Sequence, residues 1–298
     1  MMIIKKTVQE IGCDTDPWWS ALWGVAKLSK VFLCLALSVF GLYAGPWLQK
    51  RGHGIVIFGW QDYRASERFS LSGVRQPLAA GGIFEDRSFQ FWAEAGLTNR
   101  WTGILSGSIP SLRYSDAGYR ASSLSVGDLQ AGLRRGLRHA ASGWQFAAQM
   151  LLKVPAYSSR TEPRPGNGQA DLEGSLLAGR SFPVGNRWGF VSLEGGYRKR
   201  WGQPSDQLRG EASAGIHWTQ RLTFIGQTFA IRRVGSLPNS ASVWNPLVVP
   251  SFDLYKFQAS AVIRLKPDWR VQVGYGLDFA GRNIGRGRQW TVVLWKTF

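Results

Sequence analysis

The chain has 298 residues, of which 44% are hydrophobic, and its mean hydropathy of −0.14 excludes a series of apolar membrane-spanning helices. The formal net charge is +17, but the basic residues are scattered rather than gathered in one run, which argues against a nucleic-acid-binding protein. Both cysteines, Cys13 and Cys34, lie in the first 44 residues, so a product cut after them has neither disulfide nor cysteine-metal chemistry.

Residues 1–44 have the features of a leader. Lys27 and Lys30 precede the apolar run 31–43, which suits a secretory signal and is too short for a comfortable membrane helix. We expect cleavage after Ala44 or Gly45, and we interpret residues 1–26 as an over-extended start. An uncleaved N-terminal anchor is the alternative. The expected organisation is a signal peptide, 1–44, followed by one domain, 45–298, exported by the Sec route.

From Gly54 onward the chain has twelve strand-like blocks, and several of them alternate cleanly between apolar and polar residues, whereas 54–63 and 222–232 are less regular. In Trp269–Phe279 every odd position is apolar or aromatic, and every even position is polar, charged or glycine. Side chains alternate between the faces of a strand, so such a block has one apolar and one polar face. Several blocks have the roughly 9–11 residues that a tilted strand needs to cross a bilayer. The blocks are 54–63, 87–97, 101–112, 125–137, 144–154, 169–180, 188–199, 207–218, 222–232, 254–265, 269–279 and 288–298.

The links between blocks alternate in length. Short links lie at 98–100, 139–143, 183–187, 219–221 and 266–268. The other links, mostly longer, lie at 64–86, 113–124, 155–168, 200–206, 233–253 and 280–287. This alternation is typical of outer-membrane barrels and is not required of a soluble β-sandwich, the alternative fold. We therefore predict an all-β fold, a transmembrane antiparallel β-barrel of about 12 strands with both termini at the periplasmic side.

Aromatic residues mark the ends of these strands. Four tryptophans follow short links and predict a girdle at one membrane interface: Trp101, Trp144, Trp188 and Trp269. The last block ends on an aromatic residue and presents Trp290, Val292, Leu294 and Phe298 on one face. That pattern resembles the signal that delivers barrels to the barrel-assembly machinery. Lys296 falls on the same face and breaks the pattern, although its stem can snorkel.

If the apolar positions face outer-membrane lipid, the opposite positions face the lumen. The charged candidates there are Glu94, Asp128, Arg134, Lys153, Asp171, Glu173, Glu194, Arg198, Arg209, Glu211, His217, Lys256, Arg264, Arg270 and Asp278. These mixed charges are expected to brace the wall by pairing with one another. Cations left over at a constriction would favour anionic solutes.

An outer-membrane hydrolase is the enzymatic alternative, and it would need a nucleophile, a base and an orienting group within reach. The only histidines are His53, His139 and His217, and no His-x-Ser pair of the outer-membrane phospholipase kind occurs. No metal-ligand spacing is present, and neither a catalytic residue, a metal nor a cofactor is expected.

Three segments carry a resemblance to a known group of proteins: Lys50–Tyr63, Phe91–Trp101 and Val126–Leu133. In these the chain resembles transporter-like exported barrels associated with the meta-pathway of phenol degradation. The resemblance implies a barrel of this size in a Gram-negative outer membrane, for uptake of a small solute, and it carries over no functional residue. The leading hypothesis is a passive channel for an anionic or aromatic solute, and a structural or assembly protein with a plugged lumen is the rival.

Overall fold

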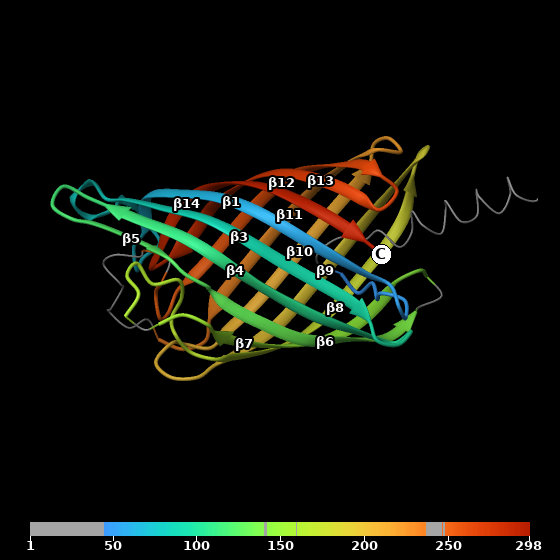
Figure 1. Ribbon diagram of the computed structural model, residues 1–298, viewed down its shortest axis with the longest axis horizontal. Helices are drawn as coiled ribbons and strands as arrows, with labels where there is room; N and C mark the ends of the chain where they lie inside the picture. Colours follow the sequence, from blue (N-terminus) through green and yellow to red (C-terminus); the bar gives the residue numbers. More distant parts are fainter. Residues whose placement is uncertain (1–44, 140–141, 159, 237–245, 247) are drawn as a thin grey trace, which may run out of the picture. The chain divides into compact units, whose positions relative to one another are not determined.

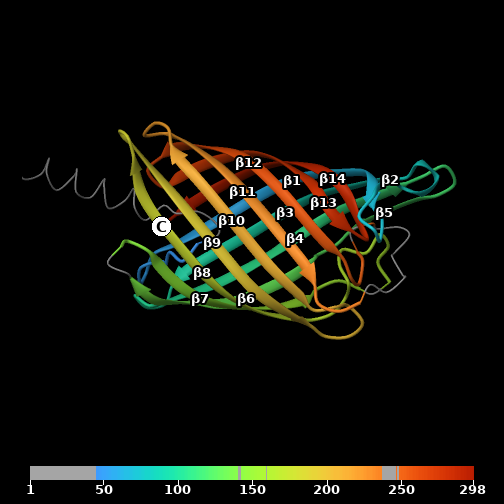
Figure 2. The ribbon, with the colours of Figure 1, turned by 180° about the vertical axis from the view of Figure 1, so that it is seen from behind.

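The fold is a closed antiparallel β-barrel. The structure, a computed structural model, describes residues 45–139, 142–158, 160–236, 246 and 248–298. Successive barrel strands pair with one another, and the first strand pairs with the last, which closes the barrel. Figures 1 and 2 show the wall from opposite sides. The twelve barrel strands of the described residues are β1 (Gly54–Phe69), β3 (Ile83–Gly96), β4 (Trp101–Ser115), β6 (Asp128–His139), β7 (Gln145–Pro155), β8 (Asp171–Val184), β9 (Arg187–Arg200), β10 (Gln207–His217), β11 (Leu222–Arg233), β12 (Asp253–Lys266), β13 (Trp269–Arg282) and β14 (Ile284–Thr297). The predicted fold class is thus confirmed.

The alternation of residue types determines which side of the wall each side chain faces. In β13, Val273 and Phe279 lie on the outer face and are 41% and 44% exposed, whereas Arg270 and Asp278 point inward and are buried. The barrel strands are 11 to 16 residues long, whereas strands of soluble proteins usually have about five or six. Long strands with an apolar outer face suit a barrel whose wall contacts lipid.

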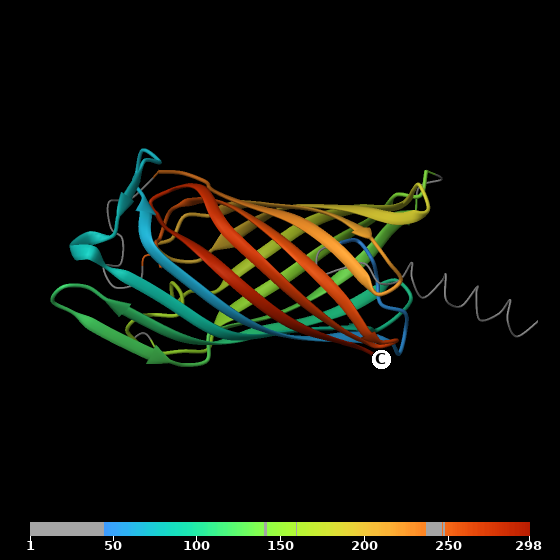
Figure 3. The same cartoon turned by 90° about the horizontal axis from the view of Figure 1, so that it is seen from above.

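The two ends of the barrel differ. One end carries the tight connections, such as 185–186 and 267–268, together with Gly54 and Phe298. We call it the short-turn end. At the opposite, long-loop end, the short strands β2 (Arg75–Pro77) and β5 (Arg120–Leu124) pair with β1 and β4 and extend the wall (Figures 1 and 3).

One expected long link is absent. The sequence predicts a connection over 280–287, but β13 and β14 continue through it and leave only Asn283 between them. Asn283 adopts a φ of 55°, a left-handed conformation that asparagine tolerates better than most residues. Its side chain is tied down on both sides, since it accepts from Arg68 and donates to the carbonyl oxygen of Ser251. These bonds hold a tight turn that composition alone does not indicate.

Residues 248–252 fold inward at the long-loop end. Val249 and Phe252 are buried in an apolar cluster with Phe69 and Ile284. The main chain beside them is also held, because the carbonyl oxygen of Pro250 accepts from Arg200 at 3.1 Å. Ile231 and Leu254, which line the lumen, pack against this cluster, so the segment lies on the lumen side of the wall.

The described residues contain little helix. The 3₁₀ turn η1 (Ala79–Gly81) lies between β2 and β3. No helix of the described residues is long and apolar enough to span a membrane.

Candidate functional site: the barrel lumen

A segment that precedes the first strand occupies the lumen at the short-turn end. Residues 45–50 contact inward-facing residues of several strands, and the ring of Trp47 meets that of Phe190 edge-on with centroids 6.2 Å apart. Two glycines make room for it. A Cβ at Gly179 would lie 2.8 Å from Pro46, and one at Gly136 would lie 2.6 Å from Leu48. We call residues 45–50 the N-terminal plug.

Charged and polar wall residues hold the plug. Arg134 of β6 pairs with Glu94 of β3 at 3.0 Å, and it also donates to the carbonyl oxygen of Trp47 at 3.2 Å. Gln49 donates its backbone amide to the Thr102 hydroxyl and its side-chain amide to Glu94. Both members of the ion pair are more than nine-tenths buried. The plug therefore binds to the barrel through specific hydrogen bonds rather than by apolar contact alone.

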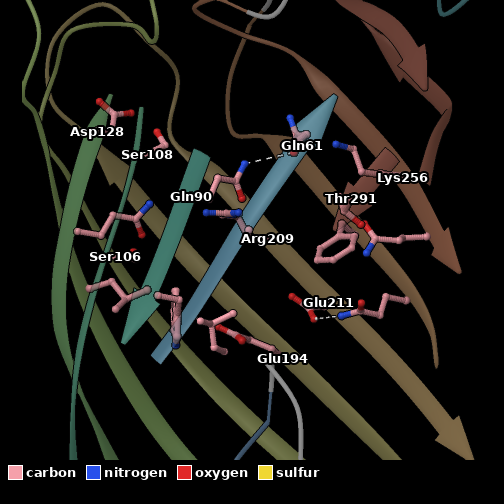
Figure 4. A pocket seen from close by; sticks show the side chains of 18 of the residues that line it. Gln61, Gln90, Ser106, Ser108, Asp128, Glu194, Arg209, Glu211, Lys256 and Thr291 are labelled. Carbon is pink, nitrogen blue, oxygen red and sulfur yellow. Dashed lines mark hydrogen bonds between the residues drawn. The ribbon is translucent and has the colours of Figure 1, made fainter. Parts of the chain in front are cut away.

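Beyond the plug the lumen opens into a polar chamber of about 640 Å³. Its wall is rich in glutamine, and some of these amides bond to one another, as Gln90 does to Gln61 at 3.2 Å (Figure 4). Trp92 lies on the inward face and donates to Glu94. The glutamines that line the chamber are Gln61, Gln90, Gln130, Gln149, Gln227, Gln258, Gln272 and Gln289.

A network of ion pairs braces one side of the wall, from β6 to β10. Lys153 lies between Asp128 and Asp171, 2.9 and 3.0 Å from their carboxylate oxygens. Arg198 and Arg209 share the carboxylate of Glu173 at 2.6 and 2.9 Å. Because each of these charges has an opposite partner, the network stiffens the wall more than it presents charge to a solute.

A second polar group lies across β12, β13 and β14. Asp278 is almost fully buried and accepts from the Tyr63 hydroxyl at 2.8 Å. Lys256 lies 3.8 Å from Asp278 and donates to Gln289 at 3.0 Å. Lys256 thus has an acidic neighbour and a neutral acceptor, whereas Lys153 has two acidic neighbours.

Two carboxylates in the chamber differ from the rest. Glu194 of β9 and Glu211 of β10 stand directly opposite each other in the strand pairing, and both line the chamber (Figure 4). Glu194 accepts from Ser175 at 2.7 Å, and Glu211 accepts from Gln227 at 3.3 Å. Their hydrogen-bond partners are neutral, and neither belongs to an ion pair of the described residues, unlike the other lumen acids named above.

The remaining sequence-predicted lumen residues lie near the short-turn end. Arg264 and Arg270 are opposite each other on β12 and β13. His217 is at the end of β10 and bonds to Thr223 at 2.8 Å. None of the three lines the chamber. The structure thus divides the predicted lumen set into three groups: residues that line the chamber, wall residues outside the lining (Glu94, Lys153, Asp171 and Asp278) that pair with it or hold the plug, and the group near the short-turn mouth.

The four tryptophans of the predicted girdle all lie at the short-turn end. Trp101, Trp188 and Trp269 are within the first two residues of a strand, and Trp144 comes directly before β7. Trp218 lies at the same end, 47% exposed, with the Arg187 guanidinium 3.4 Å from its ring centroid. Our sequence analysis did not include Trp218, which follows a strand rather than a turn.

The last strand closes the barrel against the first. The backbone amide of Phe298 donates to the carbonyl oxygen of Gly54, and the reverse bond is also present. Trp290, Val292 and Phe298 are exposed on the outer face. Lys296, which interrupts this face, pairs with Asp268 and lies 4.9 Å from the ring centroid of Trp269. The amine is therefore held at the neighbouring turn.

In the part of the chain that the structure describes, no cluster of three or more histidine, cysteine, aspartate or glutamate side chains is arranged to hold a metal ion. His139 is in the described strand β6, but its side chain is outside the described set, as is the leader that we predicted over residues 1–44.

The fold is similar to that of a solved outer-membrane channel. An outer membrane channel from Pseudomonas putida F1 superposes with a TM-score of 0.64 at 14% identity, covering 87% of this chain and 97% of that one. The translocator domain of the autotransporter NalP from Neisseria meningitidis gives a TM-score of 0.45 at 13% identity, covering 94% and 98%. No protein family model matches the chain, and no curated protein matches it by sequence.

The sequence analysis missed the plug and the uncharged chamber wall. Gly45-Pro46-Trp47 fits the boundary of the signal peptide, and its one unusual feature is a tryptophan two residues before the polar stretch Gln49–Arg51. The inward glutamines lie at the polar positions of the alternating pattern, for example Gln258 in 254–265 and Gln272 in 269–279. Because they bear no charge, they were not among the candidate lumen residues.

Proposed function

We propose that this protein is a passive channel for small polar solutes in the outer membrane of a Gram-negative bacterium. The observation that carries the proposal is the chamber: a closed barrel with an apolar outer face encloses about 640 Å³ lined by amides, hydroxyls and charges. A lumen that served only as packing would be filled by side chains, as in the smallest barrels. The shared fold with the Pseudomonas putida channel supports the same conclusion.

In the proposed orientation the short-turn end faces the periplasm, as is usual for bacterial barrels. The chain would reach the outer membrane by Sec export and insertion by the barrel-assembly machinery. The ordered plug and the inward segment 248–252 then lie at opposite mouths of the chamber. A solute has to displace or pass both, so the resting conductance is expected to be small.

The plug also favours a second candidate, a structural barrel whose lumen stays closed. The ion pair of Arg134 with Glu94 and the bond to Trp47 would hold it shut. A catalytic role has no comparable support, because the described lumen acids are engaged in wall contacts.

Planar-bilayer recordings separate the two candidates. A channel gives discrete conductance steps, and liposomes that contain it swell in small solutes but not in large ones. A barrel that inserts, shifts in mobility on heating, and yet gives neither current nor swelling is the structural protein.

A further inference from the structure

The two opposed carboxylates of the chamber carry a charge that the wall leaves unbalanced. Glu194 and Glu211 are direct cross-strand partners. Among the ion pairs of the described residues, none includes either of them, and their hydrogen bonds come from Ser175, Gln149 and Gln227. Like charges directly opposite on neighbouring strands repel each other. A cation between them would relieve that repulsion.

The nearby basic groups already have acidic partners. Arg209 is two residues before Glu211 on the same strand, and it binds Glu173 at 2.9 Å. Arg134 acts electrostatically on Glu194, but it pairs with Glu94 at 3.0 Å. Arg198 is likewise bound to Glu173. These cations moderate the field of the two carboxylates without pairing with them.

A second, independent feature of the chamber also favours a ligand that donates hydrogen bonds. Gln272 on β13 lines the chamber and is 3% exposed, yet its amide oxygen has no hydrogen-bond partner. A buried acceptor without a donor is destabilising, unless a ligand supplies the donor. The unmatched groups of the chamber, on β9, β10 and β13, therefore include acceptors that would be satisfied by N–H groups.

We propose that the chamber binds a small solute that bears a primary ammonium or guanidinium group, with Glu194 and Glu211 as its counter-charges and the Gln272 amide oxygen as a further acceptor. This rests on the proposed function, since it names the solute class for the same lumen. A cationic solute is the reverse of the anionic solute that the net charge of +17 suggests. Arg264 and Arg270 do not contradict it, because they lie outside the chamber lining.

Binding of matched probes tests the solute class directly. The full-length barrel, folded in detergent and checked by its heat-dependent mobility, is titrated calorimetrically with n-butylammonium, butyrate and 1-butanol, which share a chain length and differ in charge. We expect butylammonium to bind tightest. The isosteric double variant Glu194→Gln/Glu211→Gln should weaken it about tenfold or more.

The control is Glu85→Gln, which removes one negative charge from a residue that does not line the chamber and lies within 4.0 Å of Arg64. It should leave butylammonium binding within about twofold of the wild type. The proposal is overturned if butyrate binds as tightly as butylammonium, or if the double variant binds butylammonium as the wild type does.

Reversal potentials in a potassium chloride gradient distinguish failure of this inference from failure of the channel proposal. A cation preference that the double variant reduces supports both. Conduction with an anion preference overturns the solute class and leaves the channel intact. Binding of butylammonium through the two carboxylates, without any current, supports the solute class and contradicts the channel.

Discussion

The guanidinium of Arg134 joins the Glu94 carboxylate, 3.0 Å away, to the main chain of Trp47, 3.2 Å away. One side chain on β6 thus connects the barrel wall at β3 to the plug. The same group that stabilises the wall also determines how firmly the mouth is closed.

Shortening the plug tryptophan should open the channel. Trp47→Ala removes the ring that packs against Phe190 but leaves the backbone bond to Arg134. Because the lumen at this end loses a large side chain, we expect single-channel conductance in planar bilayers to rise several-fold. Trp101→Ala, on the outer face of β4 at the same end, is the matched control and should conduct like the wild type. Equal conductance of Trp47→Ala and wild type would show that the plug does not limit flow.

Breaking the buried ion pair should destabilise the barrel. Arg134→Met leaves Glu94 buried without its cation, and removing one partner of such a pair typically costs about 3–5 kcal/mol. Urea unfolding in lipid vesicles measures the loss. The double variant Arg134→Met/Glu94→Gln should recover most of it, since no uncompensated charge remains. A double variant that is as unstable as the single one would mean that packing, not charge, is the cause.

A charged residue on the outer face should destabilise the barrel. Leu176 lies in the middle of β8, on the outer face, and is 66% exposed. In a membrane-spanning barrel, Leu176→Arg should cost about 2–4 kcal/mol, the range for arginine at the bilayer midplane. Leu71→Arg, at an exposed loop position at the long-loop end, should cost about zero by comparison. Both are measured by urea unfolding in vesicles, and equal costs would argue against lipid contact at β8.

The loop between β9 and β10 should loosen in acid. Partial burial tends to raise the pKa of Asp206, but bonds from the Arg200 backbone amide, the Tyr197 hydroxyl and the Lys199 ammonium outweigh it and lower the pKa from 3.8 to about 2. Because the native pKa is depressed, the stabilisation is present above the unfolded value and is lost as pH falls from about 4 through 2.

Hydrogen exchange of the 201–206 segment measures this loosening. Protection from exchange, taken relative to the intrinsic rate at each pH, should fall over that pH range in the wild type and change much less in Asp206→Asn, which keeps the size of the side chain but cannot titrate. Unchanged protection down to pH 2 in the wild type would contradict the assignment.

The terminal aromatic should matter for assembly more than for the finished barrel. Phe298→Ala keeps the backbone bonds to Gly54, yet it removes the final residue of the apolar face that we interpret as the assembly signal. We expect the heat-modifiable fraction in cells to fall several-fold. The control Phe279→Ala removes an outer-face aromatic from β13 and should assemble normally. A similar fall for both variants would indicate general loss of lipid contact instead.

The sequence by itself determined the barrel, because a strand exposes a residue to each side in turn and lipid and lumen demand opposite chemistry. That period of two is local, so Trp269–Phe279 could be assigned outer and inner faces without knowledge of its neighbours. The same reasoning located the short links and the end at which the girdle tryptophans lie.

Only the tertiary structure decided which of the lumen charges are neutralised. Arg134 and Glu94 are separated by 40 positions along the chain, and Arg198 meets Glu173 only because β8 and β9 pair in one register. The same is true of Glu194 and Glu211, which become opposed through the pairing of β9 with β10. The plug and the single-residue turn at Asn283 also depend on contacts between distant segments, as with Trp47 and Phe190. Alternation along one strand carries no information about the register between strands or about a segment that folds back into the lumen. The contacts that the register and the plug create determine the charge of the chamber.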